Sequence, residues 1–191
     1  MNKIPTVIFG GSFNPVHLGH TSLAAEVCNR GLAAEVWFMV SPLNPHKAGC
    51  NLVGENERLR MVELSIAGDG RFKACDFEFS LPRPSYTVNT LAALQEAYPE
   101  REFILLIGAD NWEKFHQWYR WEEILASHRI IVYPRGSEQA PPLPPTVTWL
   151  PLPLFDVSST MVREAVAAGA CIDSFVAPAV SQYIKKNNLY K

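Results

Sequence analysis

The sequence is poor in long apolar segments and carries no excess of charge of either sign. Apolar runs such as Phe103 to Ile107 fall far short of the roughly 20 residues that a membrane-spanning helix needs. The first residues lead directly into a strand-like segment and lack the apolar core of a signal peptide. Seventeen Lys and Arg residues against nineteen Asp and Glu residues leave a net charge of -2, so the chain has no general attraction for nucleic acid or anionic lipid. We therefore expect a cytoplasmic protein without nucleic-acid or membrane partners, in which any anion site is local.

Cysteine is also sparse, and the cysteines are far apart. The absence of a CxxC pair argues against a zinc knuckle and against a dense disulfide framework, so we interpret these residues as small core side chains. They are Cys28, Cys50, Cys75 and Cys171.

Two common nucleotide-binding signatures are missing as well. The glycines that follow the first strand-like segment do not complete GxGxxG, because Ser12 and Pro15 stand where the second and third glycines would be. The chain also has no Gly-Lys-Ser/Thr, which excludes a P-loop.

Strand-like runs alternate with segments of helical spacing. The predicted strands are Thr6–Phe9, Val36–Val40, Phe72–Phe79, Phe103–Ile107, Arg129–Tyr133 and Thr146–Leu150. The predicted helices are Thr21–Arg30, Glu55–Ala67, Thr87–Tyr98, a stretch near Trp121–Ser127, and two that begin near Ser159 and Pro178.

This alternation predicts an α/β fold of the Rossmann-like, doubly wound kind, with a mostly parallel sheet and helices on both faces. We expect one domain over residues 1–191, with the C-terminal helices of residues 158–191 belonging to it. Prolines gather between Pro134 and Pro153, which we interpret as a semi-rigid loop beside the site rather than a domain linker. In such folds ligands bind where the strands end at their carboxyl termini.

The loop after the first strand carries the clearest motif, His17-x-Gly19-His20. A glycine pair, Gly10 and Gly11, precedes it, and a helix follows, whose N-terminal amides and dipole favour phosphate. The two histidines are three residues apart and can share a helical face, while the glycine between them lets a phosphate approach the backbone. Two imidazoles donating to a phosphate would stabilise charge that grows in a transition state.

Two other interpretations of these histidines remain. They could be ordinary loop and helix-start residues, which is common for an isolated HxxH. A zinc site of His17, His20 and His46 is the other, but no acidic residue or cysteine has the spacing to complete it.

Two further segments place cations or helix ends near the same edge. Lys47 follows the second strand after a proline-bounded turn, where a mobile point charge could follow a phosphate through reaction. Ser158 or Ser159 can cap the penultimate helix, and Arg163 lies on the same face.

The His-x-Gly-His segment resembles the HxGH motif of the nucleotidyltransferase superfamily, and residues 158–163 resemble the SSTxxR signature of adenylyltransferases. Three more segments, at residues 85–91, 108–112 and 118–121, are similar to elements of bacterial nicotinate-nucleotide adenylyltransferases, so the resemblance runs from Thr6 to Arg163. It implies that Trp118 stacks on the nicotinate ring and that amides near Thr87 and Tyr119 hold its carboxylate. Independently, Thr87 can cap a helix, and Asp110 after a buried strand can accept bonds from ribose hydroxyls.

The expected site divides into three sets. The catalytic residues are His17, His20, Lys47 and Arg163. The ATP-binding residues are Gly10, Gly11, Ser12, His17, Gly19, His20, Gly108, Asp110, Ser158, Ser159, Thr160 and Arg163. The residues that bind the second substrate are Asn14, Lys47, Thr87, Asp110, Trp118 and Tyr119.

The expected reaction is adenylyl transfer from ATP to nicotinate mononucleotide, with Mg²⁺ arriving on ATP and no dedicated metal ligands from the protein. The alternatives are a preference for nicotinamide mononucleotide, another acceptor such as phosphopantetheine, and a nucleotide-binding sensor without catalysis. The sequence leaves open whether the protein is a homo-oligomer.

Overall fold

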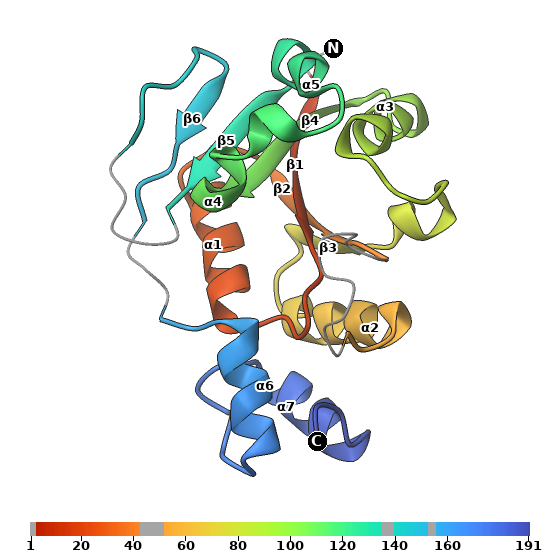
Figure 1. The fold of residues 1–191 in the computed structure, drawn as a ribbon, viewed down its shortest axis with the longest axis vertical. Helices are drawn as coiled ribbons and strands as arrows, with labels where there is room; N and C mark the ends of the chain where they lie inside the picture. The colour runs from red at the N-terminus through yellow and green to blue at the C-terminus, as the bar shows by residue number, and fades with distance from the viewer. Residues whose placement is uncertain (1–2, 43–51, 135–139, 153–155) are drawn as a thin grey trace.

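The structure is a computed structural model and describes residues 3–42, 52–134, 140–152 and 156–191. Six strands form one sheet in the order β3-β2-β1-β4-β5-β6, and every neighbouring pair is parallel. The strands are β1 (Ile4–Gly11), β2 (Glu35–Val40), β3 (Phe72–Cys75), β4 (Arg101–Gly108), β5 (Arg129–Tyr133) and β6 (Val147–Trp149). The predicted α/β fold with a parallel sheet is confirmed (Figure 1).

Helices follow the strands in the expected order. They are α1 (Leu18–Asn29), α2 (Glu55–Ile66), α3 (Thr87–Ala97), α4 (Ala109–Trp112), α5 (Trp121–Ser127), α6 (Ser159–Ala167) and α7 (Pro178–Lys186), with 3-10 turns η2 (Phe77–Ser80) and η3 (Phe115–Gln117). In the described ranges, no helix has both the length and the apolar character needed to cross a membrane.

Side chains alternate across the sheet and form two cores. In β1, Val7 and Phe9 face a core built with α1, α2, α6 and α7, whereas Ile8 faces a core built with α3 and α5. Both faces of the central strands are therefore buried, which explains their near-continuous apolar sequence. The C-terminal helices lie below α1 and α2 in the view of Figure 1.

The predicted strand Phe72–Phe79 is wrong beyond Cys75. The chain turns at Asp76, whose carbonyl accepts a hydrogen bond from the amide of Phe79 at 2.8 Å, and forms η2 instead. This turn lets Glu78 point inward, where Thr90 of α3 donates to its carboxylate at 2.9 Å. The first helix also begins at Leu18 rather than Thr21, so the motif histidines lie at its very start.

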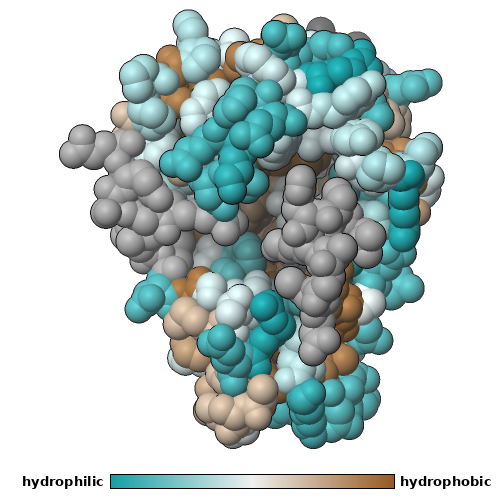
Figure 2. Space-filling view, in the orientation of Figure 1, coloured by the Kyte–Doolittle hydropathy of each residue, from teal (hydrophilic) through white to brown (hydrophobic). Residues whose placement is uncertain are grey.

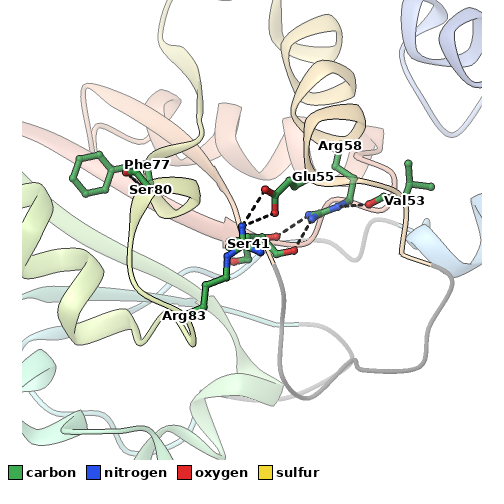
Figure 3. A network of polar contacts seen from close by, with 8 residues as sticks. Ser41, Val53, Glu55, Arg58, Phe77, Ser80 and Arg83 are labelled. Carbon is green, nitrogen blue, oxygen red and sulfur yellow. Dashed lines mark hydrogen bonds and ion pairs between the residues drawn. The ribbon is translucent and has the colours of Figure 1, made fainter.

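A buried arginine ties α2 to the loops at the carboxyl edge of the sheet (Figure 3). Arg58 is 0% exposed, and its guanidinium donates to four main-chain carbonyls, of which those of Val53 and Ser41 are labelled in Figure 3. The acceptors are Val53 at 2.9 Å, Ser12 at 2.7 Å, Ser41 at 2.9 Å and Pro42 at 3.1 Å. Burial lowers the pKa of Arg58, and the nearby Glu55 carboxylate opposes that shift. The arginine thus joins the loop after β1, the end of β2 and the start of α2.

Replacing Arg58 by Lys should lower the free energy of unfolding by about 2 to 4 kcal/mol. An ammonium cannot reach all four carbonyls, and each buried carbonyl left without a donor costs about 1 to 3 kcal/mol. Arg60→Lys on the same helix is the control, because Arg60 makes an exposed ion pair with Glu63 and its replacement should change stability by less than about 0.5 kcal/mol. Urea unfolding of both variants measures this, and equal effects would contradict the assigned role.

Replacing Glu78 by Gln should change how stability depends on pH. Burial raises the pKa of Glu78, while hydrogen bonds from Thr90 and Ser41 oppose the shift. A raised pKa means that the folded protein binds the proton more tightly, so wild type loses stability as pH rises from about 4.3 through the folded pKa. Glu78→Gln removes that loss. We expect the free energy of unfolding of Glu78→Gln, relative to that of wild type, to be higher at pH 7 than at pH 4.5, as measured by urea unfolding at both pH values. The opposite trend would show that the buried Glu78 carboxylate does not cause the pH dependence.

Candidate active site

The candidate site lies at the carboxyl ends of β1 and β4. From β1 the chain adds β2 and β3 toward one edge of the sheet, and from β4 it adds β5 and β6 toward the other edge. In open parallel sheets ligands bind in the crevice between two such strands. The loop of residues 12–17 follows β1, and Asp110 follows β4 in the first turn of α4, with Gly108 as the residue before that helix. The structure therefore brings the predicted loop and Asp110 to the same edge. In Figure 2 the surface is hollowed near the middle of the face shown, between the sheet and the C-terminal helices.

Close packing shapes the start of this loop. A Cβ atom at Gly11 would lie 3.0 Å from the Cζ atom of Phe13, so a larger residue there would displace the ring. Phe13 has a φ of 44°, its ring is buried, and it packs edge-on against Phe9 with centroids 5.6 Å apart. At Gly10 nothing lies within 4 Å of such a Cβ atom. Of these two glycines, Gly11 is therefore the one at which packing against Phe13 disfavours a larger residue.

The two motif histidines lie together at the start of α1. His17 is the residue before the helix, and its ring centroid is 3.6 Å from that of His20. The main-chain N–H of His17 donates to Nδ1 of His20 at 3.1 Å. Because a main-chain amide can only donate, Nδ1 of His20 carries no proton, and the neutral ring bears its proton on Nε2. His20 therefore offers a donor from Nε2, with its ring held against Phe9 and Phe13.

The amides at the start of α1 are partly used within the protein. The amide of Leu18 donates to the carbonyl of Phe175 at 2.8 Å, and the amides of His20 and Thr21 donate to the carbonyl of His17. In the part of the chain that the structure describes, the Gly19 amide has no such acceptor. A phosphate at this helix start would accordingly meet the Gly19 amide, where no side chain intervenes.

Helix α6 is attached to the back of the same loop. Ser158 caps the helix as predicted, because its hydroxyl accepts from the amide of Met161 at 3.2 Å. The Ser159 hydroxyl donates to the carbonyl of Pro15 at 2.8 Å. Arg163 donates to the carbonyl of Asn14 at 2.8 Å and to the Thr160 hydroxyl at 3.1 Å. The SSTxxR segment thus holds the loop of residues 12–17 in place. The spacing of residues in the sequence did not predict these contacts.

The segments expected to bind the second substrate also meet. The rings of Tyr86 and Tyr119 are 4.7 Å apart, which brings the start of α3 beside the segment with Trp118. Thr87 is not the cap that the sequence predicted: α3 begins at this residue, Tyr86 precedes the helix, and no side chain caps it. The prediction was wrong because the helix begins one residue earlier than a Thr87 cap requires. Trp118 is partly buried against Phe115, with centroids 5.4 Å apart.

Several expectations cannot be placed at this edge. Lys47 and His46 lie outside the described residues. Within the described ranges, no three His, Cys, Asp or Glu side chains are close enough to hold a metal ion. A cavity of about 560 Å³ lies beside the segment that follows β4 and includes Ala109, between Gly108 and Asp110 in the sequence, although none of the predicted site residues lines it. It is lined by Ala109, Trp112, Glu113, Phe115, His116, Trp121, Leu125, Pro141, Pro144 and Trp149.

Sequence reasoning missed two residues that support the loop of residues 12–17. Arg58 stands at a position where the spacing of α2 requires a core residue, since Met61, Val62 and Ile66 are buried on the same face. A charged residue in that register was a usable signal. Tyr190, whose hydroxyl donates to Oδ1 of Asn14 at 2.8 Å, gave no comparable signal, because it follows the last helix.

Comparisons with known proteins identify the family of this chain. Residues 8–165 match the family model described as cytidylyltransferase-like. The chain is 49% identical to the probable nicotinate-nucleotide adenylyltransferase of Bacteroides thetaiotaomicron, over 97% of this chain and 93% of the relative. It is 37% identical to the protein of the same name from Flavobacterium johnsoniae, over 96% and 97% of the two chains.

A solved structure gives the same fold. The Plasmodium falciparum nicotinic acid mononucleotide adenylyltransferase complexed with NaAD superposes with a TM-score of 0.80 at 20% identity, over 98% of this chain and 97% of that one. Family model and relatives both span most of the chain, and the chain belongs to the cytidylyltransferase-like family and, within it, to the nicotinate-nucleotide adenylyltransferases.

Proposed function

We propose that this protein transfers the adenylyl group of ATP to nicotinate mononucleotide, forming nicotinate adenine dinucleotide and pyrophosphate. The observation that carries the proposal is the pair of motif histidines at the start of α1, beside the reversal of strand order and tied to the SSTxxR helix. Membership of the family gives the acceptor.

The reaction needs positioning more than it needs a strong base. An oxygen of the acceptor's 5′-phosphate forms a bond to the α-phosphorus of ATP, and the bond from that phosphorus to the bridging oxygen breaks, its electron pair leaving with pyrophosphate. The attacking phosphate is largely dianionic at neutral pH, since its second pKa is about 6. Catalysis then consists of alignment and of stabilising the charge that moves to the leaving group.

On the ATP side, the neutral His20 donates from Nε2 to the phosphate chain, while His17 and the Gly19 amide lie beside it. Arg163 and the start of α6 contribute positive potential from the other side of the loop, and Asp110 accepts from ribose hydroxyls. Lys47, which lies outside the described residues, is proposed to contact the phosphates. ATP enters as its magnesium complex, since Mg²⁺ commonly keeps water and phosphate ligands.

On the acceptor side, the start of α3 and the segment with Trp118 and Tyr119 form the proposed nicotinate site. The first turn of α3 carries no acidic residue, so its positive end is compatible with a carboxylate. The Trp118 ring supplies a flat face for the pyridine ring. A neutral amide would lose the charge-assisted part of this recognition.

The protein should prefer nicotinate mononucleotide to nicotinamide mononucleotide by at least about tenfold in kcat/KM. Hydrogen bonds to a charged group contribute about 1.5 to 3 kcal/mol, and about 1.4 kcal/mol corresponds to a factor of ten. Parallel assays with ATP, following pyrophosphate release and the dinucleotide by chromatography, measure the ratio. Equal or reversed preference would assign the amide as substrate, consumption of phosphopantetheine alone would assign another acceptor, and no pyrophosphate with any of them would indicate a nucleotide-binding protein.

Replacing His20 by Ala should lower kcat by at least about 100-fold, the scale expected when one transition-state donor is lost. Thr21→Ala is a matched control in the same helical turn, because the Thr21 hydroxyl donates to the Leu18 carbonyl of its own helix at 3.1 Å. Steady-state kinetics on both variants, with melting temperatures to confirm folding, test the role. A folded His20→Ala protein with kcat near wild type would exclude it.

A further inference from the structure

The cavity beside the segment that follows β4 has walls from three parts of the chain. They are residues 109–116, helix α5, and the proline-rich segment with β6, the strand at that edge of the sheet. Helices α4 and α5 and strand β6 all lie in the upper half of Figure 1. The volume of about 560 Å³ falls within the range of about 300 to 1,000 Å³ that is usual for small-molecule sites. A flat compound of two fused rings fits within such a volume.

Three of the five tryptophans line this cavity. Trp112 stacks on the buried ring of Phe115, with centroids 5.2 Å apart and planes inclined by 20°. Trp121 meets the same ring nearly edge-on, at 6.1 Å and 74°. The indoles of Trp112 and Trp121 are therefore steeply inclined to one another and form a corner. Trp149 adds a third indole from β6.

The charge around the cavity favours a positive ligand. Among the ten described residues that line it, none is a lysine or an arginine, and Glu113 supplies a carboxylate. The faces of aromatic rings are electron-rich and attract cations, and several such faces together form a cage for an organic cation. A phosphate or carboxylate ligand would meet these faces and Glu113 without an opposing lysine or arginine in the described wall. The wall therefore favours a ligand that is flat, largely apolar and positively charged.

The cavity is separate from the tryptophan assigned to the proposed nicotinate site. Trp118 packs on Phe115 with centroids 5.4 Å apart, but it is not among the residues that line the cavity. A ligand in the cavity and a ring stacked on Trp118 would thus contact different indoles. This difference allows the two sites to be distinguished by mutation.

We propose that this cavity binds a small, flat aromatic cation of the pyridinium or quinolinium kind. The ring lies against the indoles of Trp112, Trp121 and Trp149, and the exposed carboxylate of Glu113 pairs with its charge. The attraction between a cation and the indole faces adds to the burial of the ring, so a charged ring binds more tightly than a neutral ring of the same shape. The inference concerns a second site and does not rest on the proposed function.

Titration calorimetry on the full-length protein without nucleotides tests the preference for charge. The probes are N-methylquinolinium and 2-methylquinoline, which have nearly the same shape, in mildly alkaline buffer where the second is uncharged. N-methylquinolinium should bind at least about fivefold more tightly. Equal or tighter binding of the neutral ring would overturn the proposal, and so would the absence of binding by the cation.

Two glutamate-to-glutamine variants test the carboxylate. Glu113→Gln should weaken binding of N-methylquinolinium at least about threefold and leave binding of 2-methylquinoline within about twofold of wild type, because only the charge is removed. Glu122→Gln is the matched control, since Glu122 is an exposed residue of α5 that does not line the cavity. Its affinities should match those of wild type. Equal effects of the two variants on the cation would contradict the assigned role of Glu113.

Two tryptophan-to-leucine variants test where the cation binds. Trp149→Leu should weaken N-methylquinolinium at least about fivefold, because one wall of the cavity loses its aromatic face. Trp118→Leu should leave its affinity within about twofold of wild type. The reverse pattern would place the cation at the proposed nicotinate site and overturn the proposal. Melting temperatures confirm folding, and if Trp149→Leu does not fold, the pair of glutamate variants decides.

The same variants separate this inference from the proposed function. Wild-type protein that binds the cation but forms no dinucleotide would overturn the proposed function alone. Wild-type protein that forms dinucleotide but does not bind the cation would overturn the second site alone.

Discussion

The arrangement of the site depends on one buried cation. Arg58 brings together the carbonyls of Ser12, Ser41, Pro42 and Val53, which come from segments distant in sequence. Carbonyl dipoles pointing at one another repel, and burying them without donors is costly, so these chain segments can converge only around a multivalent donor. The planar guanidinium supplies that donor. The loop of residues 12–17 therefore begins at Ser12, whose carbonyl Arg58 binds. The fixed start of the loop in turn determines where the histidines that follow can lie.

From this anchor outward, the loop is held by contacts from the C-terminal part of the chain. Ser159 and Arg163 bind the main-chain carbonyls of Pro15 and Asn14, and Phe175 accepts from the first amide of α1. These contacts are hydrogen bonds to the backbone, so they fix the position of the loop and do not depend on the identity of its side chains. The SSTxxR segment thus has a structural task in addition to the phosphate contact proposed for it. Precise placement of the reacting groups is what an adenylyl transfer demands of the protein.

The alternation of strands and helices could be read from the sequence because both sheet faces are buried, which gives the central strands continuous apolar runs. The order of the motifs then predicted that the His17 loop and Asp110 meet, since carboxyl ends of parallel strands share an edge. Local sequence patterns did not predict features that depend on contacts between residues far apart in the sequence. Strand β3 stops at Cys75 because Glu78 turns inward to Thr90, and Tyr190 reaches Asn14 through a fold that no local spacing encodes.

The contact between Tyr190 and Asn14 can form only at the end of synthesis of the chain. The loop of residues 12–17 is made at the start of synthesis, but its partner is 176 residues further along the chain. At about 5 to 20 residues per second, the ribosome needs roughly 10 to 35 s to cover that distance. During this interval the early strand and the histidines exist without the hydrogen bond that orients Asn14. The loop of residues 12–17 can therefore acquire all of its final contacts only after position 190 has left the ribosome.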